Sequence, residues 1–363
     1  MKNTFLKRVL FGLVIASSAL LGACSDDDTI DNTDLPGKEG FFVVNEGAFG
    51  NGDASLSYYD EEKDQMINDI FMSNTGKPLG DQAQSMNIFN GMGYIVVQGS
   101  KKIEVINLED MTSVGTVTTD DGLESPRYIV AVTANKAYVS DWGDGFNGSV
   151  KVLDLQTLKV TKTIKTGSGA NNLINVGGKV YVANSGGYGY DNTVSVIDVS
   201  TDEIIKTLEV GDNPSSLQVD EKNNIWVAGK GKTAYNADWS VDEANSTPGF
   251  IAKLNNDEVV LKLESAKVAV GFGNLVINKN YDALYYTHQG AVYRMSINDT
   301  ELPGSPFIDK SFYGLAINPF NGNLVATEAP NFSSSGTVYI YNESGVLQDQ
   351  LVAGIAPNGC AFK

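Results

Sequence analysis

Side chains able to do acid–base or metal chemistry are few in this 363-residue sequence, which has one histidine, His288, and two cysteines, Cys24 and Cys360. Imidazole-based hydrolysis needs a histidine beside a nucleophile and an acid, and no Gly-x-Ser-x-Gly elbow supplies the nucleophile. Zinc sites usually take several His and Cys ligands, which the sequence lacks. The sequence therefore predicts a protein that is not an enzyme, with no metal and no cofactor.

Aromatic and amide side chains are the remaining candidates, because they gather in long segments between predicted strands. The predicted ligand-binding residues are Asn45, Phe49, Trp142, Phe146, Asn184, Tyr188, Tyr190, Tyr235, Trp239 and Phe332. Rings offer flat apolar contacts, and amides offer hydrogen bonds without charge. Together they suit a large, nearly neutral ligand decorated with polar groups, such as a sugar or a cofactor. Alternatively, some of these rings pack between neighbouring loops and meet no ligand.

Three short motifs suggest other chemistry, but each lacks a required part. The run Gly229-Lys-Gly-Lys-Thr233 has Trp226 where a phosphate loop needs glycine. Gly187-Tyr-Gly189 is followed by neither a third glycine nor a helical pattern, so it indicates a turn. Asp141, Asp144 and Asn147 offer oxygen ligands, but their spacing is not that of an EF-hand loop.

The long segments that carry the aromatic and amide side chains lie between copies of a recurring apolar strand motif. It occupies residues 41–44, 94–97, 137–140, 180–183, 225–228, 284–287 and 324–327. Seven units at intervals of about 40 to 60 residues are typical of a β-propeller. The alternation and the β-branched content indicate strands throughout, and no window shows a convincing helical period.

Each unit continues with two further strands, such as those around 152–154 and 160–164, and is preceded by a shorter apolar strand. The first unit lacks that preceding strand, whereas residues 358–363 form a spare one at the end of the chain. We therefore predict an all-β, seven-bladed propeller of four-stranded antiparallel blades, closed by the C-terminal strand completing the first blade. The long loops at 45–53, 140–148, 184–192, 229–248 and 327–335 then share one face.

The N-terminal segment predicts export. Residues 1–23 combine a basic start with an apolar run, as in a secretory signal peptide. Leu21-Gly22-Ala23-Cys24 resembles the bacterial lipobox, which makes Cys24 the predicted lipidation site. Residues 24–40 read as an acidic tether, and residues 41–363 as the propeller. Ser25-Asp26-Asp27-Asp28 resembles the export tag of lipoproteins on the outer face of the outer membrane, although a plain tether remains the alternative.

The charge balance excludes one class of partner. Forty-four acidic residues face 26 basic ones, for a net charge of −18. Such a surface repels phosphate backbones, so we expect no nucleic-acid binding. Cys360 has no partner for a disulfide once Cys24 is lipidated.

A resemblance rests on Asn45-Glu-Gly47, Ser55-Leu-Ser-Tyr-Tyr-Asp60, Leu79-Gly-Asp81, Ser125-Pro-Arg-Tyr-Ile129 and the repeated Val-Ile-Asp turns. The chain resembles the surface-layer-type, YncE-like seven-bladed propeller lipoproteins, and within them the BtuG-like cobalamin-binding proteins. The resemblance implies an outer-membrane lipoprotein, facing the cell exterior and held by its lipid anchor alone. It also implies capture of cobalamin or related corrinoids and their delivery to a TonB-dependent transporter.

This sequence departs from that group at 141–148 and 185–191, which are longer and richer in glycine. These are loops of the predicted binding face, so the identity of the ligand stays open. The alternatives are a surface binder of a glycan or of a metal chelate such as a siderophore, an interaction scaffold and, because propeller lyases and lactonases exist, an enzyme.

Overall fold

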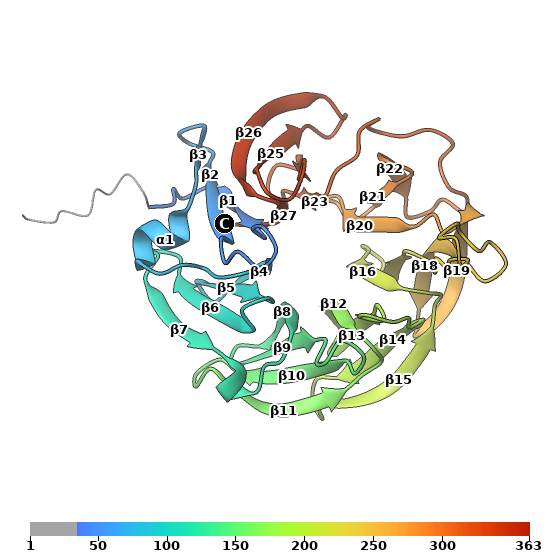
Figure 1. Cartoon of the computed structure of the whole chain (residues 1–363), viewed down its shortest axis with the longest axis horizontal. Helices are drawn as coiled ribbons and strands as arrows, with labels where there is room; N and C mark the ends of the chain where they lie inside the picture. The colour runs from blue at the N-terminus through green and yellow to red at the C-terminus, as the bar shows by residue number, and fades with distance from the viewer. Residues whose placement is uncertain (1–34) are drawn as a thin grey trace, which may run out of the picture. The chain divides into compact units, whose positions relative to one another are not determined.

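The computed structural model describes residues 35–363, which form seven antiparallel sheets arranged around a central axis (Figure 1). This confirms the predicted all-β, seven-bladed propeller. The predicted signal peptide, Cys24 and most of the 24–40 tether lie outside the described residues. Within them, no helix is long and apolar enough to cross a membrane.

In each of the first four blades, four strands follow one another from the axis outwards. Blade 1 contains β27 (Pro357–Phe362), β1 (Gly40–Asn45), β2 (Ser55–Asp60) and β3 (Gln65–Ile67). Blade 2 contains β4 (Ala83–Phe89), β5 (Met92–Val97), β6 (Lys102–Asn107) and β7 (Ser113–Val117). Blade 3 contains β8 (Pro126–Thr133), β9 (Lys136–Asp141), β10 (Ser149–Asp154) and β11 (Lys159–Lys165). Blade 4 contains β12 (Ala170–Val176), β13 (Lys179–Asn184), β14 (Thr193–Asp198) and β15 (Glu203–Glu209).

The last three blades follow the same order, with one exception. Blade 5 contains β16 (Pro214–Val219), β17 (Ile225–Gly229), β18 (Pro248–Asn255) and β19 (Glu258–Val268). Blade 6 contains only β20 (Phe272–Ile277), β21 (Ala283–His288) and β22 (Ala291–Ser296). Blade 7 contains β23 (Gly314–Ile317), β24 (Leu324–Glu328), β25 (Ser335–Tyr341) and β26 (Leu347–Ile355).

Blade 6 differs from the predicted four strands because its outer segment contains Pro303 and Pro306. Proline has no backbone N–H to donate to a strand ladder. The segment makes only an isolated bridge at Ile308, whose carbonyl oxygen accepts from the Val292 backbone nitrogen at 2.9 Å. The outer edge of β22 is therefore covered by an irregular segment instead of a regular strand.

Apolar layers between neighbouring blades make up the core. One such layer joins Phe42 and Leu56 of blade 1 to Ile95 and Ile106 of blade 2, and all four side chains are buried. The alternating pattern along each strand supplies one apolar row to each adjacent layer. Each blade therefore depends on both of its neighbours for burial.

The C-terminal strand closes the ring as predicted. Antiparallel β27 pairs with β1, with Phe362 opposite Phe41 and Cys360 opposite Val43. Burial raises the pKa of the unpaired Cys360 thiol to about 12, so the thiol is unreactive at neutral pH.

Short elements outside the blades were not predicted. Helix α1 (Ile70–Thr75) and a 3-10 turn at Thr119–Asp121 lie in two of the connections between blades. Ile70 and Phe71 are buried and belong to the layer between blades 1 and 2, which anchors α1. Leu35 packs on the same layer, so contact with blade 1 begins before residue 41.

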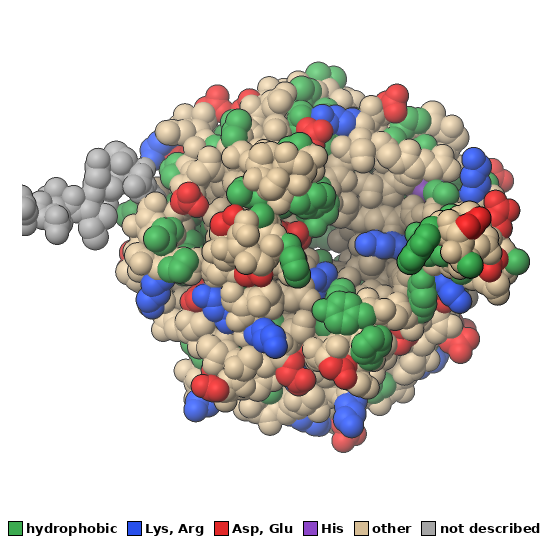
Figure 2. Space-filling view, viewed as in Figure 1, with side chains coloured by type: hydrophobic (Ala, Val, Ile, Leu, Met, Phe, Trp, Pro, Cys, Tyr) green, Lys and Arg blue, Asp and Glu red, His purple; other side chains and the backbone are tan. Residues whose placement is uncertain are grey.

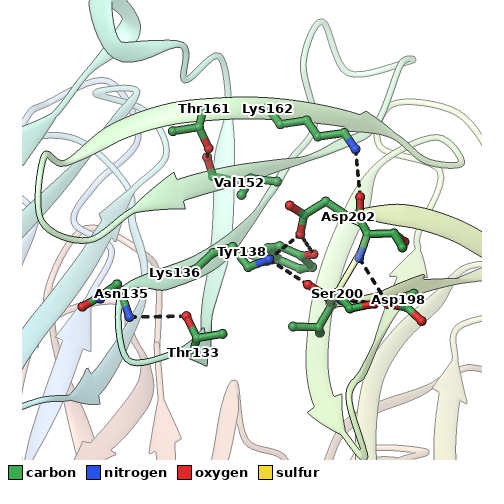
Figure 3. A network of polar contacts seen from close by, with 12 residues as sticks. Thr133, Asn135, Lys136, Tyr138, Val152, Thr161, Lys162, Asp198, Ser200 and Asp202 are labelled. Atoms are coloured by element: carbon green, nitrogen blue, oxygen red, sulfur yellow. Dashed lines mark hydrogen bonds and ion pairs between the residues drawn. The ribbon is translucent and has the colours of Figure 1, made fainter.

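A polar contact between blades 3 and 4 is shown in Figure 3, where Lys136 and Tyr138 of β9 converge on Asp202. Lys136 Nζ lies 2.6 Å from Asp202 Oδ1, and the Tyr138 hydroxyl donates to the same oxygen. The arrangement recurs between blades 4 and 5, where Lys179 and Tyr181 donate to Asp257. We call these two clusters the interblade latches, because each ties a second strand to the outer turn of the next blade.

We expect Asp257→Asn to lower the free energy of unfolding by about 1–2 kcal/mol, because it weakens two charge-assisted hydrogen bonds. Burial alone would raise the pKa of Asp257, but the hydrogen bonds from Lys179 and Tyr181 lower it below its ordinary value of 3.8. The stabilisation is therefore complete above pH 3.8 and is lost as the pH falls through the folded-state pKa. Urea denaturation at several pH values measures it, with exposed Glu301→Gln as the control. If Asp257→Asn lowers the free energy of unfolding equally at all pH values, the loss does not come from the ionised carboxylate.

Candidate functional site

A central pit of about 700 Å³ opens on the face that carries the connections between second and third strands and those between blades. We call this the long-loop face. Figure 2 shows the hollow, with Lys and Arg side chains in it and hydrophobic side chains around its edge. A second cavity of about 340 Å³ shares Gln84, Tyr128 and Asn274 with the pit, so the hollow continues between the inner strands.

One position in each inner strand, or directly before it in the case of Tyr313, builds the floor of the pit. The seven residues, which we call the floor ring, are Gln84, Arg127, Asn171, Ser215, Gly273, Tyr313 and Asn358. Each stands two residues before an inner-strand side chain that packs between blades, which are Met86, Ile129, Leu173, Leu217, Leu275, Leu315 and Cys360. The common register places all seven residues at one level of the axis. Amides, a hydroxyl, a phenol and a guanidinium make this level rich in hydrogen-bonding groups.

Arg127 is the only charged member of the floor ring. Its Nε donates to Asn171 Oδ1 at 3.3 Å, and a terminal nitrogen donates to Gln98 Oε1. The guanidinium carbon lies 4.3 Å from the centre of the Trp142 ring, a cation–π contact. These three contacts fix the guanidinium plane at the wall of the pit.

Glu46 enters the pit from the first loop of the long-loop face. The Tyr313 hydroxyl donates to its Oε2 at 2.9 Å, and Asn358 Nδ2 donates to its Oε1 at 2.6 Å. Burial raises the pKa of Glu46, although these hydrogen bonds and the charge of Arg127 oppose the shift. Glu46 is the only acidic side chain among the described residues that line the pit.

Lys230 and His288 complete the titratable groups of the pit wall. Lys230 follows β17 directly, and both burial and the positive charge of Arg127 lower its pKa. His288 ends β21, where its ring stacks on Phe272 with 4.1 Å between the centroids. Its Nδ1 lies 3.0 Å from the carbonyl oxygen of Gly271, which assigns the hydrogen to Nδ1. Burial lowers the pKa of His288, so the ring is neutral at pH 7.

The predicted aromatic residues divide into groups around the pit. Trp142 and Phe146 both contact Tyr188 edge to face, with 6.0 Å between centroids in each pair. This group joins the loops of blades 3 and 4, and Trp142 reaches the pit through Arg127. Phe332 meets Tyr313 of the floor ring at 5.0 Å. These predicted rings thus lie against pit residues or against one another.

The other predicted rings lie farther along the loops. The Tyr190 hydroxyl donates to the Thr233 carbonyl oxygen at 2.8 Å, which ties the loop of blade 4 to that of blade 5. Tyr235 and Trp239 pair at 6.3 Å within the loop between β17 and β18, and Trp239 is 83% exposed. Phe49 is 82% exposed on the first loop. None of these four side chains lines the pit itself.

The two predicted asparagines lie inside their blades. Asn45 and Asn184 are both fully buried. Asn45 Nδ2 donates to Ser57 Oγ at 2.8 Å, and Asn184 Nδ2 donates to Ser195 Oγ at 3.0 Å. Their amides therefore hold second and third strands together, and we leave them out of the site proposed below.

Residue type alone missed the floor ring, Lys230 and Glu46. The floor ring can be found in the sequence by position, because each of its residues stands at the same place relative to a predicted inner strand. The Ser125-Pro-Arg127 motif also pointed at Arg127. The Asp141, Asp144 and Asn147 cluster is not a metal site here: fully buried Asp141 accepts from the backbone nitrogens of Glu124, Ser125 and Gly143. The described residues contain no group of three His, Cys, Asp or Glu able to hold a metal ion.

Comparisons with known proteins agree on the fold. A family model described as "Domain of unknown function (DUF5074)" matches residues 39–350. No curated protein gives a significant match.

Solved structures similar to this chain include a quinonprotein alcohol dehydrogenase-like protein from Bacteroides thetaiotaomicron. It matches at 18% identity and a TM-score of 0.64, and the match covers 90% of this chain and 78% of that one. A Lactobacillus plantarum protein matches at 13% identity and a TM-score of 0.64, covering 89% and 99%. The periplasmic gluconolactonase of Pseudomonas aeruginosa matches at 11% identity and a TM-score of 0.62, covering 89% and 98%. Identities this low establish a shared propeller fold and nothing about activity.

Proposed function

Since this chain belongs to the DUF5074 family, whose description assigns no function, we propose from its geometry and motifs that it is a capture protein for cobalamin or a related corrinoid. The ligand binds over the central pit, between the floor ring and the aromatic loops. The observation that carries the proposal is the pit of about 700 Å³ with one polar side chain or glycine from each blade on its floor. Such a concave site with convergent polar groups is the usual form of a small-molecule site.

The chemistry of a corrinoid complements these groups. The corrin ring carries a rim of amide side chains, which match the hydrogen-bonding capacity of Gln84, Asn171 and Ser215 on the floor ring. Its flat faces and methyl groups suit contacts with Tyr235, Trp239 and other exposed rings of the long-loop face. The motif resemblance at Ser125-Pro-Arg127 supports the same ligand class.

Binding without catalysis is part of this proposal. The one imidazole, His288, is held by Gly271 and stacked on Phe272. Both oxygens of Glu46 accept hydrogen bonds, from Tyr313 and Asn358. Lipidation at Cys24 would anchor the propeller at the outer membrane, facing the exterior, where it delivers its ligand to a TonB-dependent transporter.

A metal chelate is the second candidate. Arg127 and Lys230 give the pit two cationic groups against one carboxyl with a raised pKa, and anionic chelates such as siderophores complement that charge. A neutral glycan uses the aromatic loops but gains nothing from these cations.

Isothermal titration of the purified protein with cyanocobalamin tests the proposal, and we expect submicromolar one-to-one binding. Trp239→Ala should weaken binding by about tenfold, because it removes a large exposed ring from the long-loop face. Phe320→Ala is the matched control, since Phe320 is 69% exposed in the turn between β23 and β24 on the opposite face. Absence of heat at high ligand excess would refute the corrinoid, and an iron-siderophore titration would follow. Equal effects of both substitutions would place the ligand elsewhere.

A further inference from the structure

Lys230 has no partner for its ammonium group in the described part of the chain. No hydrogen bond, ion pair or cation–π contact involves Lys230 Nζ, whereas Lys232 in the same loop lies over the Tyr190 ring at 5.4 Å. Lys230 nevertheless lines the pit instead of pointing from an outer surface. Lys230 is exposed to the solvent of the pit, so its ammonium group is accessible to a ligand there.

Arg127 is the second under-compensated cation of the pit. Its contacts to Asn171 and Gln98 use two of the five guanidinium N–H groups. No carboxylate of the described chain forms an ion pair with it. The Trp142 ring holds one face of the guanidinium, which leaves edge donors for a ligand in the pit.

Glu46, the one carboxyl among the described residues that line the pit, forms an ion pair with neither cation. Both of its oxygens accept hydrogen bonds from Tyr313 and Asn358 instead. Burial raises its pKa, which disfavours the negative form. Arg127 and Lys230 both line the pit, so two cations stand there against this one carboxyl. The pit is thus positively charged on a chain whose net charge is −18.

We propose that Arg127 and Lys230 form a subsite for an anionic group of the ligand, a phosphate or a carboxylate. This inference rests on the proposed function, because the subsite specifies how the pit orients the ligand that it captures. An anion there completes the donors of the guanidinium and gives the ammonium a partner. For a corrinoid ligand, the phosphodiester that joins the corrin side chain to the nucleotide base is the group that enters the subsite.

The first experiment needs no assumption about the ligand. Acetic anhydride acylates unprotonated lysine amines, and peptide mapping by mass spectrometry follows each site separately. With the full chain at constant ionic strength, we expect inorganic phosphate in place of chloride to slow acylation of Lys230 severalfold. Lys232 is the internal control and should react at the same rate in both salts. Arg127→Gln should abolish the protection. Equal acylation of Lys230 in both salts would overturn the subsite.

The second experiment uses two corrinoids. Cobinamide keeps the corrin ring and its amides but lacks the phosphodiester and the base. We expect the wild-type protein to prefer cyanocobalamin by about tenfold or more, the value of one charged hydrogen bond. Lys230→Gln and Arg127→Gln should bring the two affinities together, and Arg127→Lys should restore part of the preference. Lys230→Gln removes no contact within the described chain, so a loss of folding does not account for a change in its corrinoid affinities.

The two experiments separate the subsite from the proposed function. Phosphate protection of Lys230 without corrinoid binding would support the subsite and refute the corrinoid as ligand. Corrinoid binding with an unchanged preference in both Gln variants, and no protection by phosphate, would refute the subsite and leave capture intact.

Discussion

Removing residues 357–363 abolishes the folded state, the largest effect we expect from any change in this chain. The deletion takes away β27, the inner strand of blade 1, and with it the pairing to β1. It also removes the buried Ala361 and the partly buried Phe362, whose ring meets Phe41 at 5.6 Å. Glu46 and the Gln84 carbonyl oxygen lose the hydrogen bonds that Asn358 donates to them.

The effect is large because many interactions of β27 disappear together. Several ladder hydrogen bonds at about 1 kcal/mol each, with the burial of two apolar side chains, amount to more than about 5 kcal/mol. A domain is stable by only about 5–15 kcal/mol in total, so the truncated chain should lack a cooperative thermal transition. Calorimetry and near-ultraviolet circular dichroism measure this.

A circular permutant provides the control for the truncation. The Lys363 backbone nitrogen donates to the Gly40 carbonyl oxygen at 3.0 Å, so a short linker can join the two ends of blade 1. New ends opened in the exposed turn between β10 and β11 keep every strand. This permutant should fold. If the truncated chain melts cooperatively near the wild-type temperature, ring closure by β27 is not what stabilises the propeller.

Asp220→Ala should lower the free energy of unfolding by about 3–4 kcal/mol. Buried Asp220 accepts from Trp226 Nε1 at 2.9 Å and from Asn224 Nδ2 at 2.8 Å. It also accepts from the backbone nitrogens of Lys222 and Asn224, each at 2.9 Å. The substitution leaves the indole and amide donors buried without acceptors, at about 1–3 kcal/mol for each unsatisfied group.

The pH dependence of this loss of stability identifies the Asp220 carboxylate as its source. Burial would raise the pKa of Asp220, but the hydrogen bonds from Asn224 and Trp226 outweigh it and lower the pKa below 3.8. Its contribution is therefore present above pH 3.8 and fades as the pH falls through the folded-state value. Urea denaturation should show the deficit of Asp220→Ala shrinking in acid.

Two further variants separate geometry from charge at Asp220. Asp220→Asn keeps one acceptor oxygen, so its deficit should be smaller than that of alanine. Trp226→Phe removes the indole donor, and in that background the effect of Asp220→Ala should be reduced. A loss below about 1 kcal/mol for Asp220→Ala in the wild-type background would show that water replaces the carboxylate.

The architecture was predictable because it depends on a repeated local pattern. The apolar motif with its central aromatic or bulky residue marks the second strand of each blade, from Phe42 in β1 to Val325 in β24. The spare strand at the end of the sequence indicated where the ring closes. The irregular edge of blade 6 escaped the prediction, although Pro303 and Pro306 are visible in the sequence.

The site was predictable only in its location. Residue type directed attention to Trp239 and Phe49, whose rings lie on the long-loop face but outside the pit. It could not distinguish a loop amide from one like Asn184, which bonds across to the next strand. Arg127 and Lys230 come together only through the ring closure of seven blades, a relation between residues about a hundred positions apart in a sequence of 363.

The floor ring is modular. Each blade contributes one residue to the pit, next to strand contacts made within and between blades, so one residue can change while its strand keeps its place. Gly273 currently presents no side chain, and a Cβ there would meet only Thr287 Oγ1, at 3.1 Å. For the ligand proposed above, exchanging one floor-ring residue should therefore change the recognition of one part of the ligand and leave the other six positions as they are.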